Sequence, residues 1–451
     1  MKNIRRIAII LGTGALIGGC QGPCSKIDLG APAVQTANVD FSRYVAVGTS
    51  ISAGYQSGGM VDRHQINSYP AIFARQIGKT VQLNGQGSFS EPTVDGNGAP
   101  PLLRLVGLSP RPDIQPIGPA GTPNNTTWPS PYSNLAIPGA ILFDFNNAAR
   151  YVDPGFGPAA TLVLRNLGTV QAQLLAQQPT FVSFEFGANE VLGPATRGSS
   201  KVGNAPTNVA TYTALLGAAI GAIHAANPAA RIAIANVPDV TTIPFFTTVS
   251  SAGLYGRVHR IILAPSPNAG RDTISAAALT SGDLVTLPAS RALALGIGTS
   301  LANPLDSTLV LDEAERAVIA GTVQAMNAAV DVVARPDYIA KIDFNGALGA
   351  IRQSGIDIGG THYSDAFLTG GLFSLDGVHP TDLGHAIVAN AMITAVNERF
   401  GTRIPYARLG DYATTTSSSV RLASGEAGAN IPGRFEGIDE VVDLLGSGWR
   451  H

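Results

Sequence analysis

Two short segments, far apart in the chain, hold residue types that could carry nucleophilic catalysis by a serine. Residues 48–52 (GTSIS) place Ser50 beside a glycine, and residues 376–380 (DGVHP) place Asp376 three residues before His379. A serine nucleophile needs a base that takes its proton and a group that orients this base. We therefore expect Ser50 to be the nucleophile, His379 the base and Asp376 the group that orients His379.

Two further segments could stabilise the negative charge that develops on an attacked carbonyl. Asn189 lies in residues 187–190 (GANE), and an asparagine side chain offers two N–H donors. Gly139 lies in residues 134–140 (NLAIPGA), where a glycine would let a backbone N–H approach a substrate closely. Taken alone, each of these segments also fits an ordinary polar turn.

Two alternatives use other residues in the same part of the chain. His385 is a rival base, but it lies inside the predicted last helix, nine residues from Asp376, and we favour His379. A metal-dependent hydrolase could draw its ligands from the acids and histidines of residues 362–379, which are His362, Asp365, Asp376 and His379. Their spacing matches no familiar metal motif, so we expect no metal.

Alternating strands and helices must position these side chains. Apolar and β-branched runs predict strands at residues 44–48, 181–186, 231–236 and 338–344. Helical spacing and capping residues predict helices at residues 69–77, 212–226, 312 to about 335, and 381–400. This alternation predicts βαβ units in a three-layer α/β/α domain with a mostly parallel, roughly five-stranded sheet. Ser50 would then follow the first strand, at the edge where open α/β sheets bind their ligands.

Two stretches interrupt this alternation. Residues 91–133 hold ten of the 30 prolines, and we expect a long irregular insertion without strand or helix. Residues 245–310 are rich in Gly, Ser and Pro and form a second predicted insertion. Both are expected to surround the site. The domain would span residues 41–405, followed by a C-terminal extension at 406–451.

The N-terminus has the features of a targeting signal. A basic start is followed by a short apolar run at residues 7–17, which is too short to span a bilayer. Small residues then precede Cys20, as in a bacterial lipobox, so we expect a signal peptide at 1–19, lipidation of Cys20 and a tether at 20–40. Gln21 would direct the lipoprotein to the outer membrane of a Gram-negative cell. The alternative is an ordinary secretory signal with an incidental cysteine.

Composition excludes several other classes of protein. The chain has 451 residues, of which 45% are hydrophobic, so it can bury a sizeable core and is not wholly disordered. Its net charge of -2 argues against a nucleic-acid partner, and two cysteines exclude a disulfide scaffold. No stretch after the leader reaches 18 uninterrupted apolar residues, so we expect no transmembrane helix.

Taken together, the segments resemble the GDSL/SGNH hydrolase family over residues 43–400. The matching blocks are GTSI at 48–51 for Gly-Asp-Ser-Leu, Gly139 for the glycine block, GANE at 187–190 for Gly-x-Asn-Asp, and DGVH at 376–379 for Asp-x-x-His. The sequence departs from the family at Thr49 and Glu190, and neither departure replaces a triad or oxyanion residue. The resemblance implies a flavodoxin-like sheet.

The resemblance also implies hydrolysis of carboxylic esters through an acyl-enzyme, without a metal or an organic cofactor. The oxyanion would be held by the backbone N–H groups of Ser50 and Gly139 and by the Asn189 side chain. The substrate would be a small-molecule or lipid ester, met by an enzyme that a lipid anchor holds at the bacterial cell envelope. The alternatives are a carbohydrate acetylesterase with the same triad and an inactive, surface-anchored binding protein. Only 6% of residues are aromatic, which leaves little for sugar stacking and favours acyl or lipid esters.

Overall fold

A computed structural model describes residues 34–82, 87–107, 113–152, 158–197, 205–263 and 274–413. These residues all fall within one compact unit that starts at Val34. The predicted signal peptide (1–19) and Cys20 lie outside the described residues. So do most of the predicted tether (20–40) and most of the predicted extension (406–451).

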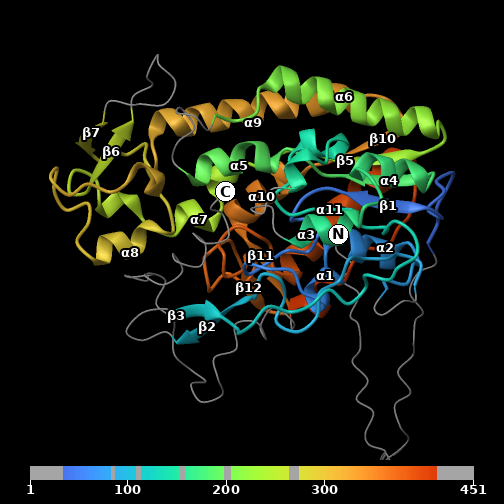
Figure 1. The fold of residues 1–451 in the computed structure, drawn as a ribbon, viewed down its shortest axis with the longest axis horizontal. Coiled ribbons are helices and arrows are strands. Elements are labelled where there is room, and N and C mark those ends of the chain that lie inside the picture. The colour runs from blue at the N-terminus through green and yellow to red at the C-terminus, as the bar shows by residue number, and fades with distance from the viewer. Residues whose placement is uncertain are drawn as a thin grey trace, which may run out of the picture. The chain divides into compact units, whose positions relative to one another are not determined.

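The expected parallel sheet is present at the centre of this unit (Figure 1). Its four strands pair in the order β1-β4-β5-β10, all of them parallel. The strands are β1 (Tyr44–Val47), β4 (Phe181–Phe184), β5 (Arg231–Ala235) and β10 (Ile339–Ile342). Each falls within a stretch that its apolar run predicts, so the predicted fold class and these four strands are confirmed.

An irregular segment occupies a fifth position, beside the free edge of β1. The Ala46 N–H donates to the Ser133 carbonyl at 2.7 Å, and the Leu135 N–H donates to the Ala46 carbonyl at 2.8 Å. Counting this segment as the second strand gives the order 2-1-3-4-5 of flavodoxin-like sheets, whose ligands bind where the strand order reverses. That point lies between the carboxyl ends of β1 and β4.

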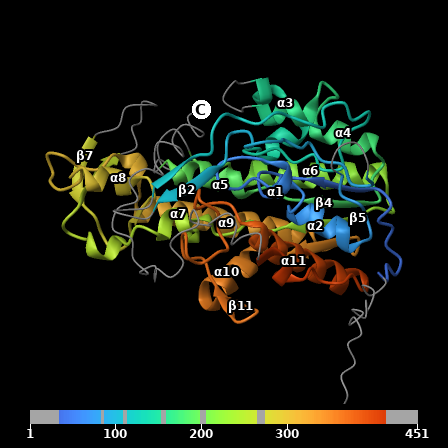
Figure 2. The same cartoon turned by 90° about the horizontal axis from the view of Figure 1, so that it is seen from below.

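Side chains of the strands alternate between two helical layers. Tyr44 and Ala46 pack toward α2 (Tyr69–Gln76) and α11 (Asp382–Phe400) in one apolar cluster. The next residue in each case, Val45 or Val47, faces the opposite cluster. That second layer contains α4 (Val170–Ala176), α5 (Ala188–Thr196), α6 (Val209–Ala226) and α9 (Glu313–Val333). Figure 2 shows α11 and α6 on opposite sides of the strands.

The predicted helices begin where their capping residues place them. Asp312 precedes α9 and accepts a hydrogen bond from the Glu315 N–H, while the Glu315 side chain accepts one from the Asp312 N–H. At the start of α11 the Thr381 side chain accepts a hydrogen bond from the Gly384 N–H. On α9 the apolar residues at helical spacing, Ile319, Val323, Met326 and Val330, are buried, and Val333 is partly buried. These helices are therefore confirmed.

The first insertion differs from its prediction. Residues 91–133 were expected to hold no strand, but they contain an antiparallel hairpin of β2 (Leu103–Gly107) and β3 (Asp113–Pro116). Leu103 and Ile114 of this hairpin are buried in the main core. Among the described prolines of this stretch, only Pro116 lies in a strand, and it is the last residue of β3. The high proline content of the stretch therefore marks its turns and does not exclude a short strand pair.

The second insertion builds a small core of its own. Its strands and helices are α7 (Pro244–Thr247), β6 (His259–Leu263), β7 (Ile274–Ala278), β8 (Leu284–Val285), α8 (Ala289–Ala294) and β9 (Val310–Leu311). Six residues form its buried cluster: Val258, Leu279, Val285, Ala289, Leu305 and Val310. The predicted boundaries of both insertions stay predictions.

Several short elements complete the described chain. They are α1 (Asp62–Gln65), α3 (Pro158–Leu164), α10 (Phe344–Ser354), β11 (Ile356–Ile358) and β12 (Thr361–Tyr363), together with 3-10 helices near residues 142–152, 240–242, 251–253 and 307–309. Among all described helices, only α6 is long and apolar enough to cross a membrane by length and composition. These two properties are weak evidence for a membrane-spanning helix, because core helices of globular proteins can share them. One side of α6 packs against the core of the sheet.

Candidate active site

The predicted nucleophile lies in the turn that follows β1. Ser50 is 5% exposed, and the turn is closed by hydrogen bonds from the Ala53 N–H to the Thr49 carbonyl and from the Tyr55 N–H to the Ser50 carbonyl. This turn stands at the carboxyl end of β1, beside the reversal point of the strand order. The strand therefore presents Ser50 where α/β sheets of this type bind ligands.

The segment that leads into α11 brings an acid and a histidine against this serine. The distance from His379 Nε2 to Ser50 Oγ is 2.9 Å, and the distance from His379 Nδ1 to Asp376 Oδ2 is also 2.9 Å. All three side chains are buried. The structure thus brings together the three predicted residues, although Ser50 and His379 are 329 positions apart in the chain.

The polar contacts of Asp376 decide how the proton sits on the imidazole. Burial by itself would raise the pKa of Asp376, but the charge of His379 and hydrogen bonds from His379 and Val378 together lower this pKa to about 2. At neutral pH the carboxylate is therefore ionised and can only accept. A neutral imidazole must then carry its proton on Nδ1, which leaves Nε2 free to accept from the Ser50 hydroxyl.

Two of the three predicted oxyanion donors, Gly139 and Asn189, lie on segments that contact each other. Asn189 is the second residue of α5, and its Nδ2 donates to the Ala140 carbonyl at 2.8 Å, which leaves the second Nδ2 hydrogen available. Gly139 adopts a φ of 79°, a left-handed conformation that favours glycine. The N–H groups of Ser50 and Gly139 are free of protein acceptors in the described part of the chain.

Glu190, one of the two departures from the family blocks, supports the glycine segment. Its Oε1 accepts from the Leu142 N–H at 2.6 Å, so adjacent residues Asn189 and Glu190 both hold the stretch 139–142. Burial raises the pKa of Glu190 to about 7. Glutamate at this position thus anchors the backbone at Leu142, three residues after Gly139.

Thr49, the other departure, is bound by an acid outside the segments that predict the site. Glu185 directly follows β4, and one of its carboxylate oxygens accepts from the Thr49 N–H at 2.9 Å and from Ser52 Oγ at 2.9 Å. Thr49 Oγ1 also donates to this carboxylate at 3.0 Å. Glu185 therefore holds the residues on both sides of Ser50. The signal in the sequence that could have identified Glu185 is the acid itself, which lies near the end of the otherwise mostly apolar run 181–186.

Burial raises the pKa of Glu185 to about 7, although hydrogen bonds from Thr49 and Ser52 act in the opposite direction. A carboxyl whose pKa is higher in the folded than in the unfolded protein stabilises the fold below the unfolded value of 4.5, and this contribution is lost as the pH rises through about 7. Glutamine has the shape of the neutral acid and cannot ionise. We therefore expect Glu185→Gln to gain stability relative to wild type as the pH rises from 4.5 to 8.

The gain should reach up to about 3 kcal/mol, since one pKa unit corresponds to about 1.4 kcal/mol. The measurement is the thermal midpoint of both proteins across this pH range. Glu398→Gln removes an exposed acid from α11 and serves as the control, for which we expect a constant difference from wild type. A difference between Glu185→Gln and wild type that does not change with pH would contradict a neutral, buried Glu185.

Neither His385 nor His362 hydrogen-bonds to Ser50 in the structure. His385 is fully buried within α11, burial lowers its pKa to about 4, and none of the described residues forms a hydrogen bond with its ring nitrogens. His362 contacts Asp357 on an exposed hairpin. Within the described part of the chain, no group of three or more His, Cys, Asp or Glu residues is placed to hold a metal ion.

Both insertions contact the loops that carry site residues. In the first insertion, the Leu103 N–H donates to the Ser57 carbonyl at 2.7 Å, shortly after the nucleophile turn. In the second, the Phe245 N–H donates to the Gly377 carbonyl at 2.9 Å, between Asp376 and His379. Each insertion therefore touches a loop next to a site residue, and the expectation that the insertions surround the site stays a prediction.

Comparisons with known proteins point to one family. The family model described as GDSL-like Lipase/Acylhydrolase matches residues 44–392. A solved structure from Parabacteroides merdae, described as a GDSL-like lipase, is 11% identical, covers 80% of this chain and 98% of its own, and has a TM-score of 0.35. An extracellular lipase from Streptomyces rimosus is 16% identical, with 78% and 98% covered and a TM-score of 0.34. No curated protein gives a significant match.

Proposed function

The chain belongs to the GDSL-like lipase/acylhydrolase family, and we propose that it hydrolyses carboxylic esters as a serine esterase or lipase. Membership of the family implies action on esters. The observation that carries the proposed mechanism is the continuous hydrogen-bonded series Ser50–His379–Asp376, with both contacts at 2.9 Å. This arrangement supplies a nucleophile, a base and a group that fixes the base, as nucleophilic acyl transfer requires.

In the proposed acylation step, Ser50 Oγ attacks the ester carbonyl while His379 Nε2 takes the serine proton. Asp376 keeps the imidazole in the required tautomer and stabilises the imidazolium. The C–O bond of the ester then breaks, and the imidazolium gives its proton to the leaving alcohol. Water subsequently attacks the acyl-enzyme with the same base, which releases the carboxylic acid and restores Ser50.

The negative charge of each tetrahedral intermediate falls on the former carbonyl oxygen. We assign its stabilisation to the N–H groups of Ser50 and Gly139 and to the free Nδ2 hydrogen of Asn189. These donors are fixed before the substrate arrives, because Asn189 already contacts Ala140 and Glu190 holds the same stretch through Leu142. Preorganised donors need no rearrangement when charge develops, and this is the main source of their effect.

The proposal is tested with purified protein and a series of p-nitrophenyl esters of increasing acyl length. We expect hydrolysis that a chelator leaves unchanged and a fluorophosphonate abolishes. A preference for longer acyl chains supports a lipid or acyl ester as substrate, whereas release of acetate from acetylated sugars would favour the acetylesterase alternative. Sensitivity to the chelator, together with resistance to the fluorophosphonate, would contradict the serine mechanism.

We further propose that a lipid on Cys20 anchors the enzyme to a bacterial membrane, on its periplasmic or outer surface. The proposal rests on the basic and apolar leader followed by small residues and Cys20. One acyl chain binds a membrane only marginally, whereas two or more hold firmly. We expect wild type to fractionate with membranes and Cys20→Ser to accumulate as uncleaved precursor or soluble protein.

Intact mass spectrometry of detergent-extracted wild type checks this expectation. The predicted result is a mature chain that begins at Cys20 and carries a diacylglyceryl thioether. The control is a chain that starts near Asp40, which keeps the catalytic residues and should retain activity on soluble esters. A mature N-terminus elsewhere, or an unmodified Cys20, would refute the anchor and leave the esterase proposal intact.

A further inference from the structure

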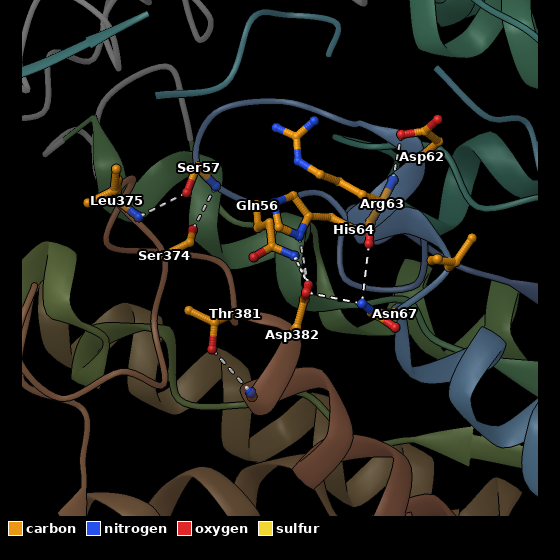
Figure 3. A network of polar contacts seen from close by, with 12 residues as sticks. Gln56, Ser57, Asp62, Arg63, His64, Asn67, Ser374, Leu375, Thr381 and Asp382 are labelled. Carbon is orange, nitrogen blue, oxygen red and sulfur yellow. Dashed lines mark hydrogen bonds and ion pairs between the residues drawn. The ribbon is translucent and has the colours of Figure 1, made fainter. Parts of the chain in front are cut away.

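A second buried histidine–aspartate pair, His64 and Asp382, joins α1 to the start of α11 (Figure 3). His64 Nδ1, from α1, is 2.8 Å from Oδ1 of Asp382, the first residue of α11. The other carboxylate oxygen accepts from Asn67 Nδ2 at 3.1 Å. Asp382 is 3% exposed. Burial by itself would raise its pKa, but hydrogen bonds and charge from its neighbours lower it, so Asp382 is an ionised acid.

The same carboxylate holds the loop that follows the nucleophile turn. Gln56 Nε2 donates to Asp382 Oδ1 at 2.7 Å, and the Gln56 side chain is buried. Figure 3 shows Gln56 and His64 converging on Asp382 from different segments. Gln56 belongs to the loop of residues 55–58. This loop starts at Tyr55, whose N–H donates to the Ser50 carbonyl and so closes the nucleophile turn.

The next residues of this loop bind the segment that carries the proposed triad acid. The Ser57 N–H donates to Ser374 Oγ at 2.8 Å, and Ser374 Oγ in turn donates to Asp376 Oδ1 at 3.0 Å. The Gly58 N–H donates to Asp376 Oδ2 at 3.1 Å. That oxygen is the same one that accepts from His379 Nδ1. The loop therefore reaches both oxygens of Asp376, one of them through Ser374.

The first residue of the loop packs on the histidine itself. The ring centroid of Tyr55 is 4.8 Å from that of His379, with an angle of 54° between the planes. Tyr55 Oη donates to the Gly58 carbonyl at 2.5 Å, which ties the ring to the end of the same loop. Residues 55–58 thus contact His379 through the Tyr55 ring and Asp376 through the Gly58 N–H, and the Ser57 N–H reaches Asp376 through Ser374.

We propose that Asp382 is a positioning residue for the Asp376–His379 pair. It holds Gln56, and through residues 55–58 it determines where the loop meets Asp376 and His379. This inference rests on the proposed esterase function. The loop of residues 55–58 binds the segment 376–382 at both ends, at Asp376 and at Asp382. Without the contact at Asp382, only the contacts of Ser57 and Gly58 hold this loop against Asp376.

An alternative role for Asp382 is purely structural, because an acid in the first turn favours the start of a helix. The informative variant is therefore Gln56→Met. It keeps the length of the side chain, removes the hydrogen bond to Asp382, and leaves Asp382 bound to His64 and Asn67. A structural role of the contact would lower the thermal midpoint without changing the rate constant of the reaction.

We expect Gln56→Met to lower kcat on a p-nitrophenyl ester on the order of 10- to 100-fold, with KM little changed, because small displacements of catalytic groups have effects of this size. The rate of labelling by a fluorophosphonate should fall by a similar factor. Asp357→Asn is the matched control, since it disrupts a histidine–aspartate contact of 2.9 Å on the exposed hairpin β11–β12. Its kcat and labelling rate should equal those of wild type.

A double-mutant cycle with Asp382→Asn completes the test. If Gln56 and Asp382 act through one network, the double variant should be about as active as the less active of the two single variants. The losses in kcat are then not additive. Additive losses, or wild-type kcat and labelling in Gln56→Met, would overturn the inference. Absence of labelling in wild type would instead contradict the proposed function, so the two failures are distinguishable.

Discussion

Ser50→Ala is expected to lower ester turnover by roughly 10⁶-fold, the size of effect found when a serine hydrolase loses its nucleophile. The physical reason is that alanine has no oxygen to form the acyl-enzyme, while His379 Nε2 loses the hydroxyl that lies 2.9 Å away. Hydrolysis of a short p-nitrophenyl ester by purified protein, followed at saturating substrate, measures this change.

The fold should survive this substitution. Ser50 lies in a turn whose hydrogen bonds are made by backbone groups, so removing its hydroxyl leaves them in place. We therefore expect little change in the thermal midpoint. Ser130→Ala, at an exposed serine of the first insertion, is the control and should keep wild-type turnover. Turnover by Ser50→Ala that equals wild type would remove Ser50 from the reaction.

Asn189→Ala is expected to reduce kcat by roughly 10²–10³-fold, the usual effect of removing one oxyanion donor. The loss falls on kcat because the oxyanion exists only in the tetrahedral intermediates and the transition states that flank them. Alanine also removes the 2.8 Å contact with the Ala140 carbonyl, so a control must separate the two roles of this amide.

Asn227→Ala provides this control. Asn227 is also half-buried, and its Nδ2 donates to the Pro179 carbonyl at 2.9 Å, a contact of the same kind near the opposite ends of β4 and β5. We expect this variant to lose some stability and to keep its kcat. If Asn189→Ala behaved in the same way, the side chain would be a structural part of the turn and not an oxyanion donor.

The central strands could be predicted from the sequence because burial on both faces leaves a local pattern. Residues Tyr44–Val47 are all buried, and the apolar run alone marks them as a strand. The helix α9 carries its own start signal in Asp312 and Glu315, whose reciprocal hydrogen bonds lie within one turn. Elements whose determinants are close together in the chain are therefore visible in the sequence.

The parts that could not be predicted depend on contacts between distant segments. The stretch 133–137 joins the sheet through backbone hydrogen bonds to β1, and its side chains show no strand pattern. Glu185 meets Thr49 across 136 positions, and Gln56 meets Asp382 across 326. No local pattern encodes such pairs.

The candidate site shows the same division. Ser50, Asp376 and His379 could be proposed because their residue types and local spacing are those that acyl transfer needs. Residues that hold these groups in place, such as Tyr55 and Ser374, have no chemical signature of their own and are recognised only by what they touch. Their contribution therefore had to come from the structure.

The most direct test of the proposed mechanism is the identity of the residue that a fluorophosphonate modifies. Such a probe reacts with a serine activated by an adjacent base and forms a stable covalent bond with its oxygen. Purified protein is labelled, its intact mass is measured, and the modified peptide is sequenced by mass spectrometry. We expect a single adduct on Ser50 that is absent from Ser50→Ala. An adduct on any other residue, or no adduct on protein that hydrolyses esters, would overturn the proposed mechanism.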